Sequence, residues 1–85
     1  MNNQEFLRIA ILQIFNDATV GDNVNPLTLE ELNKLVYLRF KDELIDRDIE
    51  WTWQHSIASS RKHLVDSKEL IRKKVGKTTY YTPKG

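Results

Sequence analysis

The chain has 85 residues, of which 40% are hydrophobic and 29% are charged, with a formal net charge of +1. These values are typical of one globular domain with a modest core and exclude a disordered chain. The absence of cysteine excludes disulfide bonds and thiolate metal sites and favours a reducing compartment. No stretch approaches the roughly 18 to 20 apolar residues of a membrane span, and residues 1–5 lack the basic region of a signal peptide. We therefore expect one cytoplasmic domain over residues 1–85, without membrane contact.

The first predicted element is a helix over residues 3–19. Its apolar residues recur at spacings of three and four and form one stripe, which contains Leu7, Ala10, Ile11, Ile14, Phe15 and Ala18. Ile9 and Leu12 lie outside this stripe, so either a second element or a partner subunit covers them, and a homodimer through this helix stays open. Residues 17–26 are predicted to form a loop, which could include a short strand at 23–27. The turn-forming residues of this loop are Gly21, Asp22, Asn23 and Pro26.

The second predicted helix begins at Thr28 and runs to about Phe40. Thr28 and Glu31 form a capping-box pattern, in which the threonine oxygen accepts from the Glu31 amide and the glutamate reaches back to the Thr28 amide. The buried face is predicted to contain Leu29, Leu32, Leu35, Val36 and Phe40. Residues 41–50 are strongly acidic, and they either extend this helix or connect it to the next one.

A third helix is predicted over residues 52–66. Placing residues at intervals of about 100° brings Trp53, Ile57 and Leu64 to one face, with Ala58 and Val65 at its flank. The opposite face has no acidic residue before Asp66 and contains Thr52, His55, Ser56, Ser59, Lys62 and His63. We expect Trp53 in the core and Trp51 as a cap at the start of the helix. The alternative use of the two indoles is a stacking platform for single strands.

Two strands follow at residues 69–74 and 78–82, because these stretches are rich in β-branched and aromatic residues. Residues 75–77 join them as a tight turn in which Gly76 can adopt positive φ. The predicted order is therefore three helices followed by a C-terminal β-hairpin. It indicates an α+β fold, mostly α, of the winged helix-turn-helix class, with the hairpin as the wing.

The small net charge hides an uneven distribution along the chain. Residues 1–50 have a net charge of −5, whereas residues 51–85 have a net charge of +6. The folded domain would then have two electrical faces, of which the basic one suits a polyanion. The alternative is that these bases form only the solvated face of a hairpin.

The third helix and the hairpin contain the candidate DNA-binding residues. Small or polar side chains let a helix approach base edges in the major groove. Bases on the hairpin can contact phosphates, which supply affinity but no sequence information. The candidates are Gln54, His55, Ser56, Ser59, Lys62, His63, Arg72, Lys73, Lys74, Lys77 and Thr78. Arg61 lies beside the buried face, where it either pairs with an acid such as Glu50 or contacts a phosphate.

No catalytic or metal site is expected from the sequence. His55 and His63 are eight residues apart, which is about 12 Å along a helix and too far to share a metal ion. The chain has no Gly-rich phosphate loop, nucleophile motif or paired carboxylates on a defined element. We therefore expect neither enzyme activity nor a cofactor, and we interpret the acids of residues 41–50 as a solvated surface.

Residues 53–85 resemble the end of the N-terminal winged-helix domain of Mrr-type restriction endonucleases. In that family a helix with the pattern hydrophobic-x-x-x-Arg-x-x-Leu leads into a Leu-Ile strand with basic residues, and a hairpin closes on Thr-x-Lys-Gly. The matching residues are Ile57, Arg61, Leu64, Leu70, Ile71, Tyr81, Thr82, Lys84 and Gly85. The sequence departs from the family at Ser67 and Lys68, where the family has a small residue and a glycine.

The resemblance implies a DNA-recognition module whose nuclease would be a separate domain. This chain would then be a standalone protein or a fragment that ends at Gly85. We expect it to bind double-stranded DNA, as a transcription regulator or as the targeting module of a restriction-like system. The alternative is a winged-helix module for protein interaction or dimerisation, which would use Ile9, Leu12 and Phe6 or the acidic residues 41–50.

Overall fold

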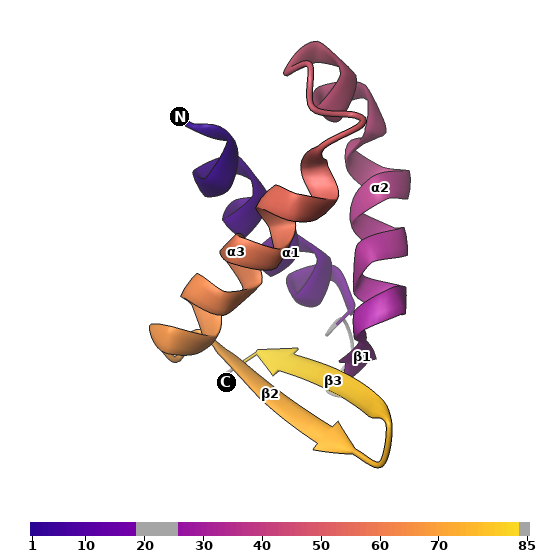
Figure 1. Ribbon diagram of the computed structural model, residues 1–85, viewed down its shortest axis with the longest axis vertical. Helices are drawn as coiled ribbons and strands as arrows, with labels where there is room; N and C mark the ends of the chain where they lie inside the picture. Colours follow the sequence, from indigo (N-terminus) through magenta and orange to yellow (C-terminus); the bar gives the residue numbers. More distant parts are fainter. Residues whose placement is uncertain (19–25, 84–85) are drawn as a thin grey trace.

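The computed structural model describes residues 1–18 and 26–83, and within these ranges the chain forms three helices and three strands (Figure 1). The elements in chain order are α1 (Asn3–Ala18), β1 (Leu27–Thr28), α2 (Leu29–Asp46), α3 (Trp53–Asp66), β2 (Leu70–Val75) and β3 (Thr78–Pro83). The chain is thus α+β and mostly helical, as the sequence predicts. The helices pack together above the sheet, which closes one end of the domain (Figure 1).

The predicted order of three helices followed by a hairpin is wrong in one respect, because β1 lies between α1 and α2. Leu27 pairs with Tyr81 and Thr28 with Tyr80, so the antiparallel sheet has the strand order β1-β3-β2. A strand of two residues is too short to show the alternation by which strands are recognised, and its partner lies far away in sequence. Of the short strand considered at 23–27, only the last position falls in β1; residues 23–25 lie outside the described ranges.

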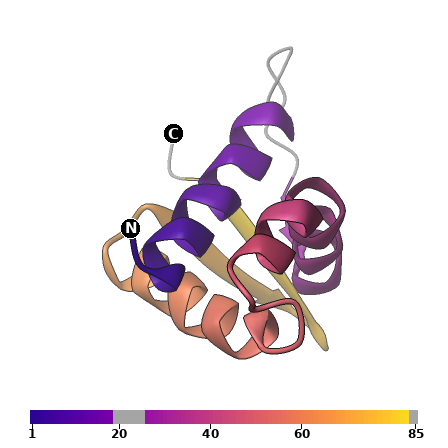
Figure 2. The same ribbon diagram turned by 90° about the horizontal axis from the view of Figure 1, so that it is seen from above.

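The core lies between α1, α3 and the sheet, with α2 along one side (Figure 2). The predicted stripe of α1 is confirmed where its side chains are described, since Leu7, Ala10, Ile11, Ile14 and Phe15 are all buried. Of the apolar residues outside it, Phe6 is buried in the core and Leu12 packs partly against it, whereas Ile9 is 45% exposed. Phe6 is therefore not available to a partner, contrary to the interaction hypothesis. The sheet and the other two helices supply Leu27, Leu32, Val36, Leu44, Ile49, Trp53, Ile57, Leu64, Leu70 and Tyr81.

The acidic residues after Phe40 extend α2 instead of forming a long connection. The helix continues to Asp46, with a kink at Phe40, whose φ of −116° and ψ of 16° are not helical. Beyond the kink, Leu44 is completely buried, so the last turns of α2 are held by the core. The predicted capping box is also present: the Glu31 amide donates to Thr28 Oγ1 at 3.1 Å, and the Thr28 amide donates to Glu31 Oε1 at 3.0 Å.

Both α2 and α3 end in a Schellman motif, with a residue of left-handed conformation just after the helix. Asp48 has φ of 58° and Lys68 has φ of 66°. After α2, the Asp48 and Ile49 amides donate to the Ile45 and Leu44 carbonyls, and the corresponding bonds after α3 run from Lys68 and Glu69 to Val65 and Leu64. These bonds satisfy carbonyls that a helix end leaves free. Lys68 thus occupies a position for which glycine is the preferred residue.

Candidate nucleic-acid interface

The face of α3 that points away from the core contains most of the predicted reading residues. Trp53, Ile57, Ser60 and Leu64 form its buried side. Of the predicted contact residues on this helix, Ser56 is partly buried and the others are exposed; the exposed ones are Gln54, His55, Ser59, Lys62 and His63. The predicted orientation of α3 is therefore confirmed.

Ala58 is an exposed residue that the sequence analysis placed wrongly at the flank of the buried face. It follows His55 by three positions and precedes Lys62 by four, and residues at these spacings are neighbours on a helix. A methyl group at this point leaves room for another molecule to approach the helix backbone. Its small size was the signal that could have found it, but the angular projection placed it at the flank of the buried face.

Ser60 is a second residue that the sequence analysis missed. It is 1% exposed, and its hydroxyl lies 3.2 Å from the Gln4 carbonyl and 3.0 Å from the Ser56 carbonyl. Because a serine is small, α1 and α3 can approach closely there, and the bond to Gln4 links the two helices. Ser60 thus helps to fix which face of α3 is exposed.

The hairpin confirms the predicted strands to within one residue at each end. Gly76 and Lys77 form the turn, and Gly76 has φ of 62°, as a two-residue hairpin turn requires at its first position. A Cβ added at Gly76 would meet no atom within 4 Å. The glycine is therefore required by its backbone conformation and not by lack of space.

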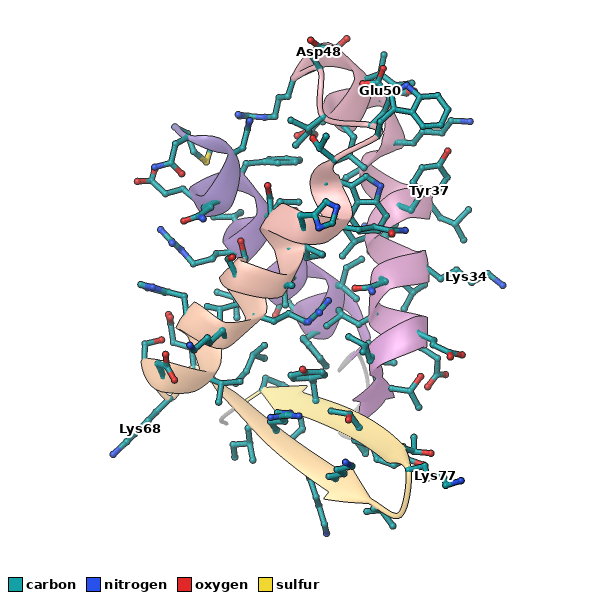
Figure 3. The ribbon with its side chains drawn as sticks, viewed as in Figure 1. Lys34, Tyr37, Asp48, Glu50, Lys68 and Lys77 are labelled. Atoms are coloured by element: carbon teal, nitrogen blue, oxygen red, sulfur yellow. The ribbon has the colours of Figure 1, made fainter. Side chains whose placement is uncertain are left out.

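The basic side chains of the hairpin do not all point in one direction. Arg72 and Lys74 alternate with Lys73 along β2, and Arg72 pairs across the sheet with the buried Tyr81. Arg72 and Lys74 therefore lie on the side of the sheet that faces the core, while Lys73 lies on the outer side. Lys77 extends from the turn (Figure 3). All four residues are exposed, as is Thr78 beside the turn.

The exposed face of α3 and the tip of the hairpin lie on the same side of the domain. In the view from above, α3 and the tip of the hairpin both lie along the lower edge of the picture, whereas α1 crosses its upper half (Figure 2). Within the described residues, the side chains of Lys62, Arg72, Lys73, Lys74 and Lys77 have no hydrogen-bond or ion-pair partner. α3 and both faces of the hairpin therefore present cations that form no ion pair with the described part of the protein.

Arg61 is a structural residue of this region, but its partner is Asn33 and not Glu50, the acid considered as one of two alternatives. Its Nη1 donates to Asn33 Oδ1 on α2 at 2.7 Å, and its guanidinium lies 5.9 Å from the centre of the Tyr81 ring on β3. Arg61 is partly buried, with a buried Nε that has no partner. One side chain of α3 thus contacts both α2 and the sheet and helps to set the angle of α3.

The two tryptophans before and at the start of α3 have different environments. Trp53 is 5% exposed and stacks on Tyr37, with 6.0 Å between ring centres and 23° between ring planes. Trp51 is 88% exposed, so the prediction that it caps the helix is wrong. Thr52 stands at the N-cap and makes no side-chain bond there. The placement of Trp53 in the core is confirmed.

The described part of the chain contains neither a candidate metal site nor a helix that could span a membrane. Its histidines and carboxylates form no group of three or more that could hold a metal ion, and none of its helices is both long and apolar enough to cross a membrane. No protein-family model matches the chain, and comparison with curated proteins and with solved structures gave no match.

Proposed function

We propose that this chain is a winged helix-turn-helix domain that binds double-stranded DNA, with α3 in the major groove and the β2–β3 hairpin on the phosphate backbone. The element order supports it, because β1 between α1 and α2 completes a three-stranded sheet beside three helices. In winged helices the last two strands of such a sheet form the wing. The resemblance of residues 53–85 to Mrr-type domains stays a prediction.

The observation that carries the proposal is that α3 and the tip of the hairpin lie on the same side of the domain and both have exposed cations without ion-pair partners in the described part of the chain. Lys62 on α3 and the four bases of the hairpin are exposed, and none of their side chains forms an ion pair within the described residues. Such a cluster repels itself unless a polyanion neutralises it. DNA does so with the release of its own counterions, which favours binding at low salt.

The exposed face of α3 supplies the groups that could read bases. His55 and Ser59 offer an imidazole and a hydroxyl for base edges, and Lys62 can reach a guanine or a phosphate. Ala58 between them allows the close approach that a major groove demands. We propose roles in transcription regulation or in targeting a restriction-like system, with any nuclease in a separate domain.

Fluorescence anisotropy with a labelled duplex of random sequence, measured over a range of salt, tests the proposal. We expect the logarithm of the affinity to fall linearly with the logarithm of salt. Replacing Lys73, Lys74 and Lys77 by alanine should weaken binding several-fold and lower the slope by about 2 to 3, because each lost phosphate contact removes about 0.9.

The matched control removes three charges elsewhere, at Arg8, Lys34 and Lys41 on α1 and α2. We expect it to leave the salt slope within about 1 of the parent. If both triple variants lose the same affinity, net charge and not the hairpin is responsible. If the hairpin variant binds as tightly as the parent at low salt, the hairpin is not the anchor.

Self-association through α1 is a second candidate, favoured by the 45% exposure of Ile9 beside Leu12. The two residues line a shallow depression together with Arg8 and Glu69. Sedimentation of the parent and of an Ile9→Lys variant tests this surface. A parent that stays monomeric at high concentration would exclude it, whereas a dimer lost in the variant would support binding to two half-sites.

A further inference from the structure

An open pocket lies between α2 and the start of α3, away from the basic hairpin. Its volume is about 490 Å³, within the range of about 300 to 1,000 Å³ that ligand pockets occupy. The residues that matter for its chemistry are Asn33, Tyr37, Glu50, Trp51, Trp53 and Gln54. Three aromatic rings and one carboxylate thus meet beside two neutral amides.

Two of the three aromatic rings are held in place by packing, and the third is exposed to solvent. Trp53 is buried and stacked on Tyr37, so these two rings are held in place. Trp51, at 88% exposure, offers an indole that packs on little of its own protein. An indole face attracts a cation through its ring quadrupole, and a guanidinium can also stack on it.

Glu50 adds a hydrogen-bond acceptor that the domain leaves unused. Its Oε2 is buried and has no hydrogen-bond partner. A carboxylate is an acceptor only, and a buried acceptor without a donor is destabilising. A positively charged donor in the pocket would neutralise this carboxylate, and a rotation of the carboxylate would bring Oε2 to the donor.

The charges near the pocket are mixed, because Lys34 lines it and Lys41 lies 5.9 Å from the centre of the Tyr37 ring, but acids outnumber bases over residues 41–50. The last turns of α2 and the following loop contain Asp42, Glu43, Asp46 and Asp48. The one arginine among them, Arg47, lies 4.4 Å from the centre of the Phe6 ring and donates to the Met1 carbonyl and to Asn3. Lys34 lines the pocket rim but extends away from Glu50 (Figure 3).

We propose that this pocket binds an arginine side chain in a basic segment of a partner protein, with the guanidinium stacked on Trp51 and donating to Glu50. Arginine fits better than lysine, because its planar fork can stack and make two parallel bonds to a carboxylate. Asp48 and Glu50 lie at the opposite end of the long axis from Lys77 (Figure 3). Glu50 therefore lies far from the hairpin contact, whereas Gln54 belongs both to this pocket and to the proposed reading face of α3.

Intrinsic fluorescence provides a direct assay, because Trp51 and Trp53 are the only two tryptophans of the chain. The probe is a blocked peptide with three arginines separated by glycines, and its control has citrulline, which is neutral and nearly the same shape, in place of arginine. We expect a saturable change in emission with the arginine peptide and none with the citrulline peptide.

Three variants locate the binding. Glu50→Gln should weaken it by about tenfold or more, and Trp51→Leu by about threefold or more. Asp48→Asn removes an equal charge next to the pocket and should change affinity by less than about twofold at physiological salt. Asparagine tolerates the left-handed conformation of residue 48. The two independent variants of the pocket keep the test valid if one of them unfolds.

Four results would overturn the proposal. These are no saturable response to the arginine peptide, equal binding of the citrulline peptide, equal losses in Glu50→Gln and Asp48→Asn, or an unchanged affinity in Trp51→Leu. A single-stranded thymidine oligonucleotide is the competing probe. If it binds through Trp51, and more tightly once Glu50 is neutralised, the indole is a stacking platform for nucleic acid instead.

Discussion

Replacing Lys68 by glycine should stabilise the domain. Lys68 has φ of 66° at the end of α3, where a residue with a Cβ is destabilised by about 1 to 2 kcal/mol. Glycine removes this strain, but its greater freedom in the unfolded chain offsets about 0.5 to 1 kcal/mol of the gain. The expected net gain is about 0.5 to 1 kcal/mol, which corresponds to a rise in Tm of about 2 to 8 °C for a domain of this size.

The assay is thermal and urea unfolding followed by circular dichroism, with two control variants. Lys68→Ala removes the charge but keeps the Cβ, so its free energy of unfolding should stay within about 0.5 kcal/mol of the parent. Asp48→Gly relieves the equivalent position after α2, where φ is 58°. The gain should be smaller there, because aspartate tolerates this conformation better than lysine. The reasoning is refuted if Lys68→Gly is no more stable than the parent, or if Lys68→Ala gains as much.

Three other variants test the roles that the structure gives to Ser60, Ala58 and Glu30. Ser60→Ala should lose about 1 kcal/mol of stability in urea unfolding, because it removes the hydroxyl that bonds to the α1 backbone; the exposed Ser59→Ala is its control, and equal losses would argue against a special role. Ala58→Glu should weaken duplex binding by about tenfold or more in the anisotropy assay. Its control, Gln13→Glu, makes the same charge change on α1 and should have less than about a twofold effect. Similar effects of the two variants would exclude α3 as the face that reads the bases. Glu30 lies beside Lys77 and Thr78 in a groove at the start of α2. Because Glu30→Gln removes a negative charge beside the hairpin, it should strengthen duplex binding about twofold to threefold at low salt. An unchanged affinity would place the DNA away from that groove.

Features that depend on neighbouring residues in the sequence were predictable. The capping box of Thr28 and Glu31 forms within one helical turn, and the apolar stripe of α1 repeats often enough to define its buried side. The hairpin turn was predictable for the same reason, because Gly76 stands between two stretches of strand-forming residues. In each case the signal and the structure that it specifies lie within a few residues of each other.

Features that depend on distant parts of the chain were not predictable in the same way. The strand at Leu27 exists because Tyr81 pairs with it from the other end of the sequence. Arg61 could be placed beside the buried face, but its partner Asn33 is set by how α2 crosses α3. Trp51 was expected to pack, because an indole is large and apolar, yet the loop leaves it in solvent. The periodicity of a sequence carries no information about such tertiary contacts.

The strand order β1-β3-β2 has a consequence for how the protein behaves at high concentration. It leaves β2 as an outer strand, and outer strands with free backbone groups are templates for pairing between molecules. β2 carries Arg72, Lys73 and Lys74 in a row, so two copies that approached edge to edge would repel each other. The same three charges thus protect the domain from aggregation through this edge. Variants that neutralise them call for a check of monodispersity by light scattering before their affinities are compared.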